Sequence, residues 1–247
     1  MIVLNPKELE KALQERQKIL NAPEAGATIW RYYSLDKFLS LITSKRLFFS
    51  SAPSFEDPFE GDYGERAKES IRSQYGNGQY LQDLEVYRFL RPHTYVSCWY
   101  EDEYESFGMW KVYGEGVAVR TQFGNIHKLL TWSESEIKQA GRVNYIDYKT
   151  DHINVDCSYL PYFFKRKSFA HEREVRFLIQ EYRPDWDDYP KPLPGKSIDL
   201  DLNNDIQEFV ISPTMPLHVC DAIEKIIQQA GLTVPVRRSV LLNKPIW

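Results

Sequence analysis

Two glutamates one residue apart, Glu172 and Glu174, are the residues of this chain whose types and spacing best suit chemistry. Apolar residues follow at every second position, at Val175, Phe177 and Ile179, which predicts that Glu174 begins a β-strand. Side chains two residues apart on a strand point to the same face, so both carboxylates are expected at one end of it. Two neighbouring carboxylates resist joint ionisation, and such pairs often act as acid/base or charge-stabilising groups.

The same pair also fits a structural role. Arg173, Arg176 and Lys167 are close enough in sequence to neutralise a charged strand end. The residue types therefore leave two interpretations open, a catalytic carboxylate pair and a set of ion pairs.

Lys165 lies seven residues before Glu172. A helix over 159–171 is predicted, and its continuation would place both side chains on one face. Lys165 could then form a salt bridge with Glu172 or contact a phosphate group of a ligand.

Three acids, Glu56, Asp57 and Glu60, lie within five residues beside a proline. Their oxygens could hold a hard cation. They could equally cap a turn, which Asp-Pro often begins, or pair with Arg176 or Lys165. Neither an EF-hand pattern nor a CxxC spacing occurs in the chain, so no metal ligand is assigned.

Trp110 and Tyr113 are three residues apart, so on a helical segment over 106–113 they share a face. Core packing explains such a pair, and a platform on which a flat ligand stacks is the alternative. Aromatic residues are abundant, with 16 Tyr, 13 Phe and 6 Trp among 247 residues, so surfaces for stacking are plentiful.

Composition narrows the classes of function. The net charge of −4 and the pI of 5.8 lack the basic footprint of a duplex nucleic-acid binder. The three cysteines have no paired spacing, which fits reduced thiols in a cytoplasm. Neither a basic-then-apolar leader nor a run of about 18 apolar residues is found, so we expect a cytoplasmic protein without a membrane partner.

Hydrophobic periodicity predicts the elements that must position these residues. Strands are expected at 28–33, 47–50, 95–99, 116–121, 143–148, 175–180, 197–202, 208–212 and 234–240, and helices at 5–21, 35–46, 66–90 in pieces, 126–140, 159–171 and 219–230. Strands and helices mix without strict alternation. The sequence therefore predicts one α+β domain over 28–247, with a mixed, mostly antiparallel sheet core and flanking helices, and a helical extension over 1–27.

Several segments occur in an order that resembles a known bacterial family. They are 30–34 (WRYYS), 54–61 (SFEDPFEG), 97–99 (SCW), 109–113 (MWKVY), 116–119 (GVAV), 143–148 (VNYIDY), 164–166 (FKR) and 169–176 (FAHEREVR). Together they resemble the family called domain of unknown function 2971 (DUF2971), from about residue 28 to near the C-terminus. The resemblance implies a family, and that family carries no settled activity.

A more distant similarity links the chain to toxin-type and DNA-modifying ADP-ribosyltransferases. Such enzymes open with a strand that bears His or Arg, continue with a helix and a second strand, and carry a catalytic Glu, often in an ExE pair, at the head of a late strand. Arg31 with the helix and strand that follow it is similar to the opening, and Glu172 with Glu174 is similar to the close. Ser97 is the nearest match to the Ser- or Tyr-bearing middle strand.

This similarity implies NAD as a substrate, with no bound cofactor and no acceptor assigned, and a role in phage-conflict or toxin biology. Glu174 would stabilise the positive charge on the ribose, and Glu172 would deprotonate or orient the acceptor. The implied ligand contacts are Arg31 on a phosphate or ribose hydroxyl, and Tyr32, Trp110 or Tyr113 stacked on nicotinamide. For Arg31, an ion pair with a carboxylate at the core edge is the alternative.

Two other functions stay open. One is a non-catalytic module that binds a nucleotide or a partner protein. The other is a metal-dependent nuclease or phosphohydrolase, since Asp147 and Lys149 form a D-x-K pattern to which Glu172 or Glu174 could add a ligand.

Overall fold

The computed structural model describes residues 20–151, 157–182 and 189–245. The predicted helix at 5–21 therefore lies almost entirely outside the described residues. The protein is α+β, with a mixed, mostly antiparallel sheet and flanking helices, as periodicity predicted. The chain divides into two compact units of three segments each: unit 1 is 1–23, 49–97 and 131–196, and unit 2 is 24–48, 98–130 and 197–247.

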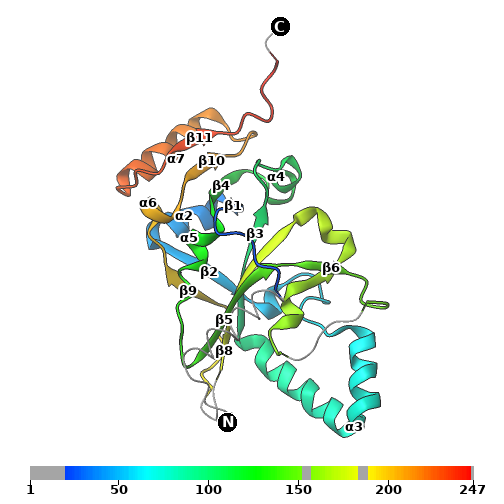
Figure 1. Cartoon of the computed structure of the whole chain (residues 1–247). Helices are drawn as coiled ribbons and strands as arrows, with labels where there is room; N and C mark the ends of the chain where they lie inside the picture. The colour runs from blue at the N-terminus through cyan, green and yellow to red at the C-terminus, as the bar shows by residue number, and fades with distance from the viewer. Residues whose placement is uncertain (1–19, 152–156, 183–188, 246–247) are drawn as a thin grey trace. The chain divides into compact units, whose positions relative to one another are not determined.

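Unit 2 is built on neighbouring strands in the order β11-β10-β4-β1 (Figure 1). Antiparallel pairing joins β1 to β4 and β4 to β10, and β11 adds in parallel to β10. The C-terminal end of β3 pairs with β1 at Ile29 and Trp30. The bounds are β1 Thr28–Ser34, β3 Thr94–Glu101, β4 Gly116–Gln122, β10 Glu208–Ile211 and β11 Val236–Arg238.

The register of these strands divides their side chains between two faces. Trp30 pairs with Arg120, which pairs with Glu208, so these three side chains form one row across the sheet. Because side chains alternate along a strand, Tyr32 shares the face of Trp30, and Arg31 points to the opposite face. This alternation decides which predicted residues can act together in unit 2.

Helices cover both faces of the unit 2 strands. Helix α4 (Phe107–Tyr113) places Met109 and Trp110 in a buried cluster with Trp30 and Tyr32. On the other face, Phe38 of α2 (Leu35–Ser44) packs edge-on against Phe209, with the two ring centroids 5.2 Å apart. The remaining helices are α5 Phe123–His127, α6 Leu202–Asp205 and α7 Leu217–Gln229. Among all described helices of the chain, none is long and apolar enough to span a membrane.

Unit 1 holds β8 (Glu174–Glu181), which pairs antiparallel with β5 (Glu136–Arg142) and also pairs with β3. All eight residues of β8 are buried, so both of its faces are covered. The other elements of unit 1 are α3 Gly64–Leu90 with a kink at Gly76, β6 Asn144–Ile146, β7 Phe164–Arg166, and the 3₁₀ turns η1 Ala52–Ser54, η2 Arg91–His93, η3 Leu160–Phe163 and η4 Lys167–Glu172. Strands β2 Arg46–Ser51 and β9 Gly195–Asp199 each have residues in both units.

The helix predicted at 126–140 is wrong. Helix α5 ends at His127, and Glu136–Arg142 forms β5. Seven residues of β5 pair in register with β8. Partners far along the chain therefore overrode the local helical pattern.

The helix predicted at 159–171 is also wrong. This segment forms the turn η3, the strand β7 and the turn η4. Strand β7 pairs in parallel with β6, so a partner strand and not the local pattern decides the conformation here.

Candidate functional site

Glu174 is the first residue of β8, as predicted, and its carboxylate is held by Arg176. Arg176 Nε donates to Glu174 Oε1 at 3.0 Å, and Nη2 donates to Oε2 at 2.8 Å. The two side chains share a face because they are two residues apart on a strand. Glu174 is 6% exposed and Arg176 is fully buried. The predicted pairing of the strand end with Arg176 is confirmed.

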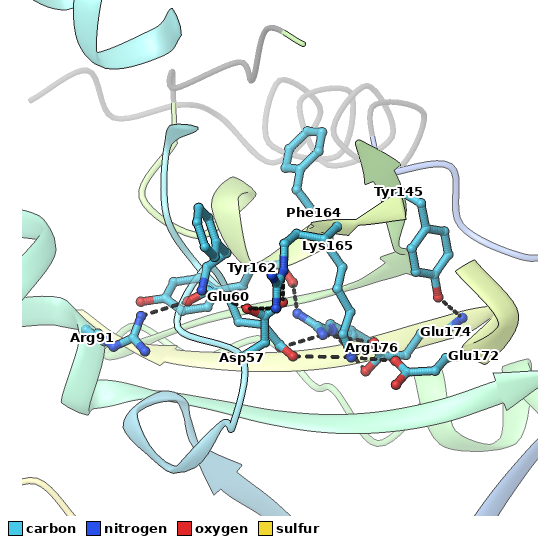
Figure 2. A network of polar contacts seen from close by, with 12 residues as sticks. Asp57, Glu60, Arg91, Tyr145, Tyr162, Phe164, Lys165, Glu172, Glu174 and Arg176 are labelled. Atoms are coloured by element: carbon cyan, nitrogen blue, oxygen red, sulfur yellow. Dashed lines mark hydrogen bonds and ion pairs between the residues drawn. The ribbon is translucent and has the colours of Figure 1, made fainter. Parts of the chain in front are cut away.

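A second carboxylate, from Glu60, reaches the same guanidinium (Figure 2). Arg176 Nη2 donates to Glu60 Oε2 at 2.6 Å, and Nη1 donates to the carbonyl oxygen of Tyr162 at 2.6 Å. All three nitrogens of the guanidinium thus have acceptors. A buried cation with such partners is well compensated for its loss of water.

Lys165 adds a second cation beside the carboxylates. Its Nζ donates to Glu172 and lies 3.2 Å from Glu60 Oε1 and 3.5 Å from Glu174 Oε2. Burial lowers the pKa of Lys165, but Glu174 and Glu60 outweigh this effect and raise it above the ordinary value. We call Glu60, Lys165, Glu172, Glu174 and Arg176 the carboxylate cluster; it contains three acids and two bases.

Glu172 is the most accessible carboxylate of this cluster, with a side chain 22% exposed against 6–7% for Glu60 and Glu174. It ends the turn η4, and Arg173 after it has a φ of 40°, so strand alternation does not extend to Glu172. Burial raises the pKa of Glu172, Lys165 opposes this rise, and the charges of Glu174 and Glu60 add to it. The pair with Lys165 was predicted, but a turn and not a helix forms it.

The acidic loop is joined to basic side chains. Asp57 accepts from Arg166 at 3.0 and 3.1 Å through its two oxygens, and Glu60 belongs to the carboxylate cluster. The predicted pairing of this loop with Arg176 and Lys165 is confirmed for Glu60. Among the described residues, no group of three His, Cys, Asp or Glu side chains could hold a metal ion.

The D-x-K pattern lies in a turn of unit 1. Asp147 Oδ1 accepts from the backbone N–H of Lys149 at 2.9 Å, a bond typical of a turn that begins with Asp. This bond gives Asp147 a local role in the backbone.

The predicted aromatic residues come together in unit 2. The ring of Tyr32 lies edge-on to Trp110, with the ring centroids 4.8 Å apart, and it stacks on Tyr113, with the centroids 6.0 Å apart. Tyr32 Oη accepts from the N–H of Ser106, and burial raises its pKa. Tyr32 and Trp110 are about 4% exposed, whereas Tyr113 is 43% exposed. Tyr32 and Trp110 are therefore core residues, and Tyr113 is the one of the three open to solvent.

Arg31 lies on the face of β1 opposite Tyr32. Its guanidinium packs over the rings of Tyr33 at 5.0 Å and Trp99 at 5.9 Å, and donates to the carbonyl oxygen of Phe48 at 3.0 Å. Alternation therefore separates Arg31 and Tyr32, so the prediction that both contact one ligand is wrong for this pair. Ser97, in the unit 1 part of β3, is fully buried.

One cavity in unit 2 was not predicted from sequence. It has a volume of about 430 Å³, and its lining residues are Trp30, Glu103, Tyr104, Glu105, Arg120, Glu208, Arg237, Val240 and Leu241. Arg120 Nε is buried and has no hydrogen-bond partner among the described residues. The only sequence signal was a charged residue at the end of an apolar strand, which does not reveal its neighbours.

Comparison with known proteins leaves the family open. Neither the family models nor the curated proteins searched contain a match to the chain. The resemblance to the DUF2971 family therefore stays a prediction that rests on the segments quoted above.

Proposed function

We propose that this protein acts as a binding module, and that its carboxylate cluster stabilises unit 1 and is not a catalytic centre. The observation that carries the proposal is the pair of hydrogen bonds from Arg176 to both oxygens of Glu174, inside a strand buried on both faces.

A carboxylate that stabilises an oxocarbenium ion must present its negative charge to the substrate. The charge of Glu174 is balanced at 2.8–3.0 Å by a guanidinium that is itself fully buried. Breaking such a pair leaves an uncompensated buried charge, which costs several kcal/mol. Glu174 is therefore better suited to fixing the start of β8 than to meeting a ribose.

ADP-ribosyl transfer is the second candidate, and one observation favours it. Glu172 is partly exposed, and its pKa is raised, as suits a residue that exchanges a proton. The order of Arg31 on β1, then α2, then β2 is also the order that the resemblance implies.

Nicotinamide release and thermal unfolding, measured with millimolar NAD, separate the two candidates. For a binding module we expect no nicotinamide release and no NAD-dependent rise in melting temperature. Replacing Glu174 with Gln should lower the free energy of unfolding by about 3 kcal/mol, because Arg176 loses a charged partner.

The control for this substitution is Glu56→Gln, at an exposed position of the acidic loop. It should change the free energy of unfolding by less than about 0.5 kcal/mol. Nicotinamide release that Glu174→Gln abolishes while the melting temperature is unchanged would overturn the proposal and favour the transferase.

A further inference from the structure

The unit 2 cavity lies on the sheet face that carries Trp30, Arg120 and Glu208 in one row. Arg237 of β11 is on the same face, because it pairs with Val210, two residues from Glu208. The cavity volume of about 430 Å³ falls within the range of small-molecule sites.

Arg120 is the residue of this cavity that most clearly lacks a partner. Its guanidinium lies 5.7 Å from the ring centroid of Trp30, and its buried Nε has no hydrogen-bond partner among the described residues. Buried polar groups are nearly always paired, and an unpaired donor on a charged group is costly. Arg120 is half-buried and lines the cavity, and no described carboxylate forms an ion pair with it. A carboxylate entering the cavity would therefore meet the accessible part of an unpaired guanidinium.

Arg237 cannot serve in the same way, because it is already engaged. Its Nε donates to Glu208 and its Nη1 donates to Glu105, both at 3.0 Å. Glu105 also accepts from Trp110 Nε1 at 2.9 Å. Burial lowers the pKa of Arg237, but Glu105 and Glu208 outweigh it and raise the pKa above its ordinary value. These bonds fix the wall of the cavity.

The charges of the residues that line the cavity indicate a ligand with both a negative and a positive group. Two arginines and three glutamates leave one net negative charge, so a simple anion would meet both Arg120 and a repulsive field. Glu103 is exposed and has no ion-pair partner within the described part of the chain. A ligand with both a carboxylate and an ammonium group would satisfy both ends.

We propose that this cavity binds a small zwitterion of the amino-acid class, with its carboxylate on Arg120 and its ammonium group toward Glu103. Tyr104, Val240 and Leu241 are 76%, 59% and 38% exposed, and they offer an apolar surface for the ligand side chain. This inference rests on the proposed function as a binding module.

Isothermal titration of the whole chain with three probes tests the inference. Leucine carries both charges, leucinamide lacks the carboxylate, and N-acetylleucine lacks the ammonium group. We expect leucine to bind roughly tenfold more tightly than either derivative, since each loses one charged contact.

Two variants assign the contacts. Arg120→Gln should weaken leucine binding roughly tenfold without changing that of leucinamide, and Glu103→Gln should weaken leucine without changing N-acetylleucine. Arg238→Gln is the matched control, because Arg238 follows Arg237 on the opposite face and pairs with Asp221. If Arg120→Gln fails to fold, the binding of leucine and N-acetylleucine to Glu103→Gln, a substitution at an exposed position, tests the inference by itself.

The absence of leucine binding at about 10 mM would overturn the inference. N-acetylleucine binding as tight as that of leucine would overturn it as well. Neither result depends on NAD, so failure here is distinct from the Glu174-dependent nicotinamide release that would overturn the proposed function.

Discussion

Glu172 and Glu174 have different surroundings although one residue separates them. Glu174 meets a fully buried guanidinium through both oxygens, whereas Glu172 meets one ammonium group and stays partly exposed. Arg173 between them has a positive φ, so the chain turns there and the strand begins only at Glu174. The two carboxylates are therefore expected to respond differently to pH and to substitution.

Glu172→Gln should change how stability depends on pH. The pKa of Glu172 is raised in the folded protein, so its contribution to stability is greatest in acid and is lost as pH rises through that pKa. The variant lacks this loss, so its free energy of unfolding relative to wild type should increase between about pH 4 and pH 7. Urea unfolding at several pH values measures this difference.

Glu172→Asp keeps the charge and serves as the control. Its free energy of unfolding should change with pH in the same direction as that of wild type. A difference between Glu172→Gln and wild type that is constant over this range would contradict the assigned pKa direction.

At the scale of elements, β8 explains why a polar strand can be fully buried. Its apolar residues alternate with Arg176 and Gln180, and each of these has buried partners. Gln180 donates to Thr94 at 2.8 Å and accepts from Ser158 at 2.5 Å. Paired polar side chains thus let a strand with one polar face lie between neighbours.

The loop that carries Glu60 into the cluster depends on Gly61. Gly61 has a φ of +80°, and a Cβ placed there would lie 2.5 Å from the ring of the buried Tyr162. Gly61→Ala should therefore lower the free energy of unfolding by more than about 1 kcal/mol, as measured in urea.

Gly78 of α3 is the matched control, because a Cβ there meets nothing within 4 Å. Gly78→Ala should raise stability by about 0.5–1 kcal/mol, since alanine favours a helix. Equal effects from both substitutions would show that the contact with Tyr162 does not limit the loop.

At the scale of the whole molecule, each unit is assembled from three separate chain segments. Residues that line one cavity or one cluster therefore come from distant parts of the sequence. Arg176 and Glu60, for example, are 116 positions apart. The net charge of −4 is also a property of the whole chain, and it determines the long-range electrostatic interaction with a charged partner.

That net charge predicts that duplex DNA binds weakly. A 20-base-pair duplex titrated at about 0.15 M salt should show no change in fluorescence anisotropy at micromolar protein, because no basic footprint offsets the phosphates. The same titration at about 0.05 M salt is the control for weak electrostatic binding. Micromolar binding at the higher salt would contradict the prediction.

Several elements were predicted close to their observed bounds. The strands β1, β3, β4, β8 and β10 and the helices α2 and α7 have the periodicity of their own element. Strands β5 and β7 were missed because their pairing with β8 and β6 decides their conformation. For the candidate site, the ion pairs of Glu174 and Glu60 were among the predicted alternatives, and the cavity around Arg120 was not predicted.

Alternation along β1 and β8 depends on immediate neighbours in the chain, so it puts Arg31 and Tyr32 on opposite faces and Glu174 and Arg176 on one face. The prediction of one ligand site for Arg31 and Tyr32 did not follow this alternation. The partners of these side chains depend on pairings between distant strands and loops, such as Trp30 with Arg120 and Glu60 with Arg176. Burial then sets the strength of each contact, because charges interact more strongly away from water. Folding therefore decided that Glu174 is neutralised and that Arg120 faces a cavity.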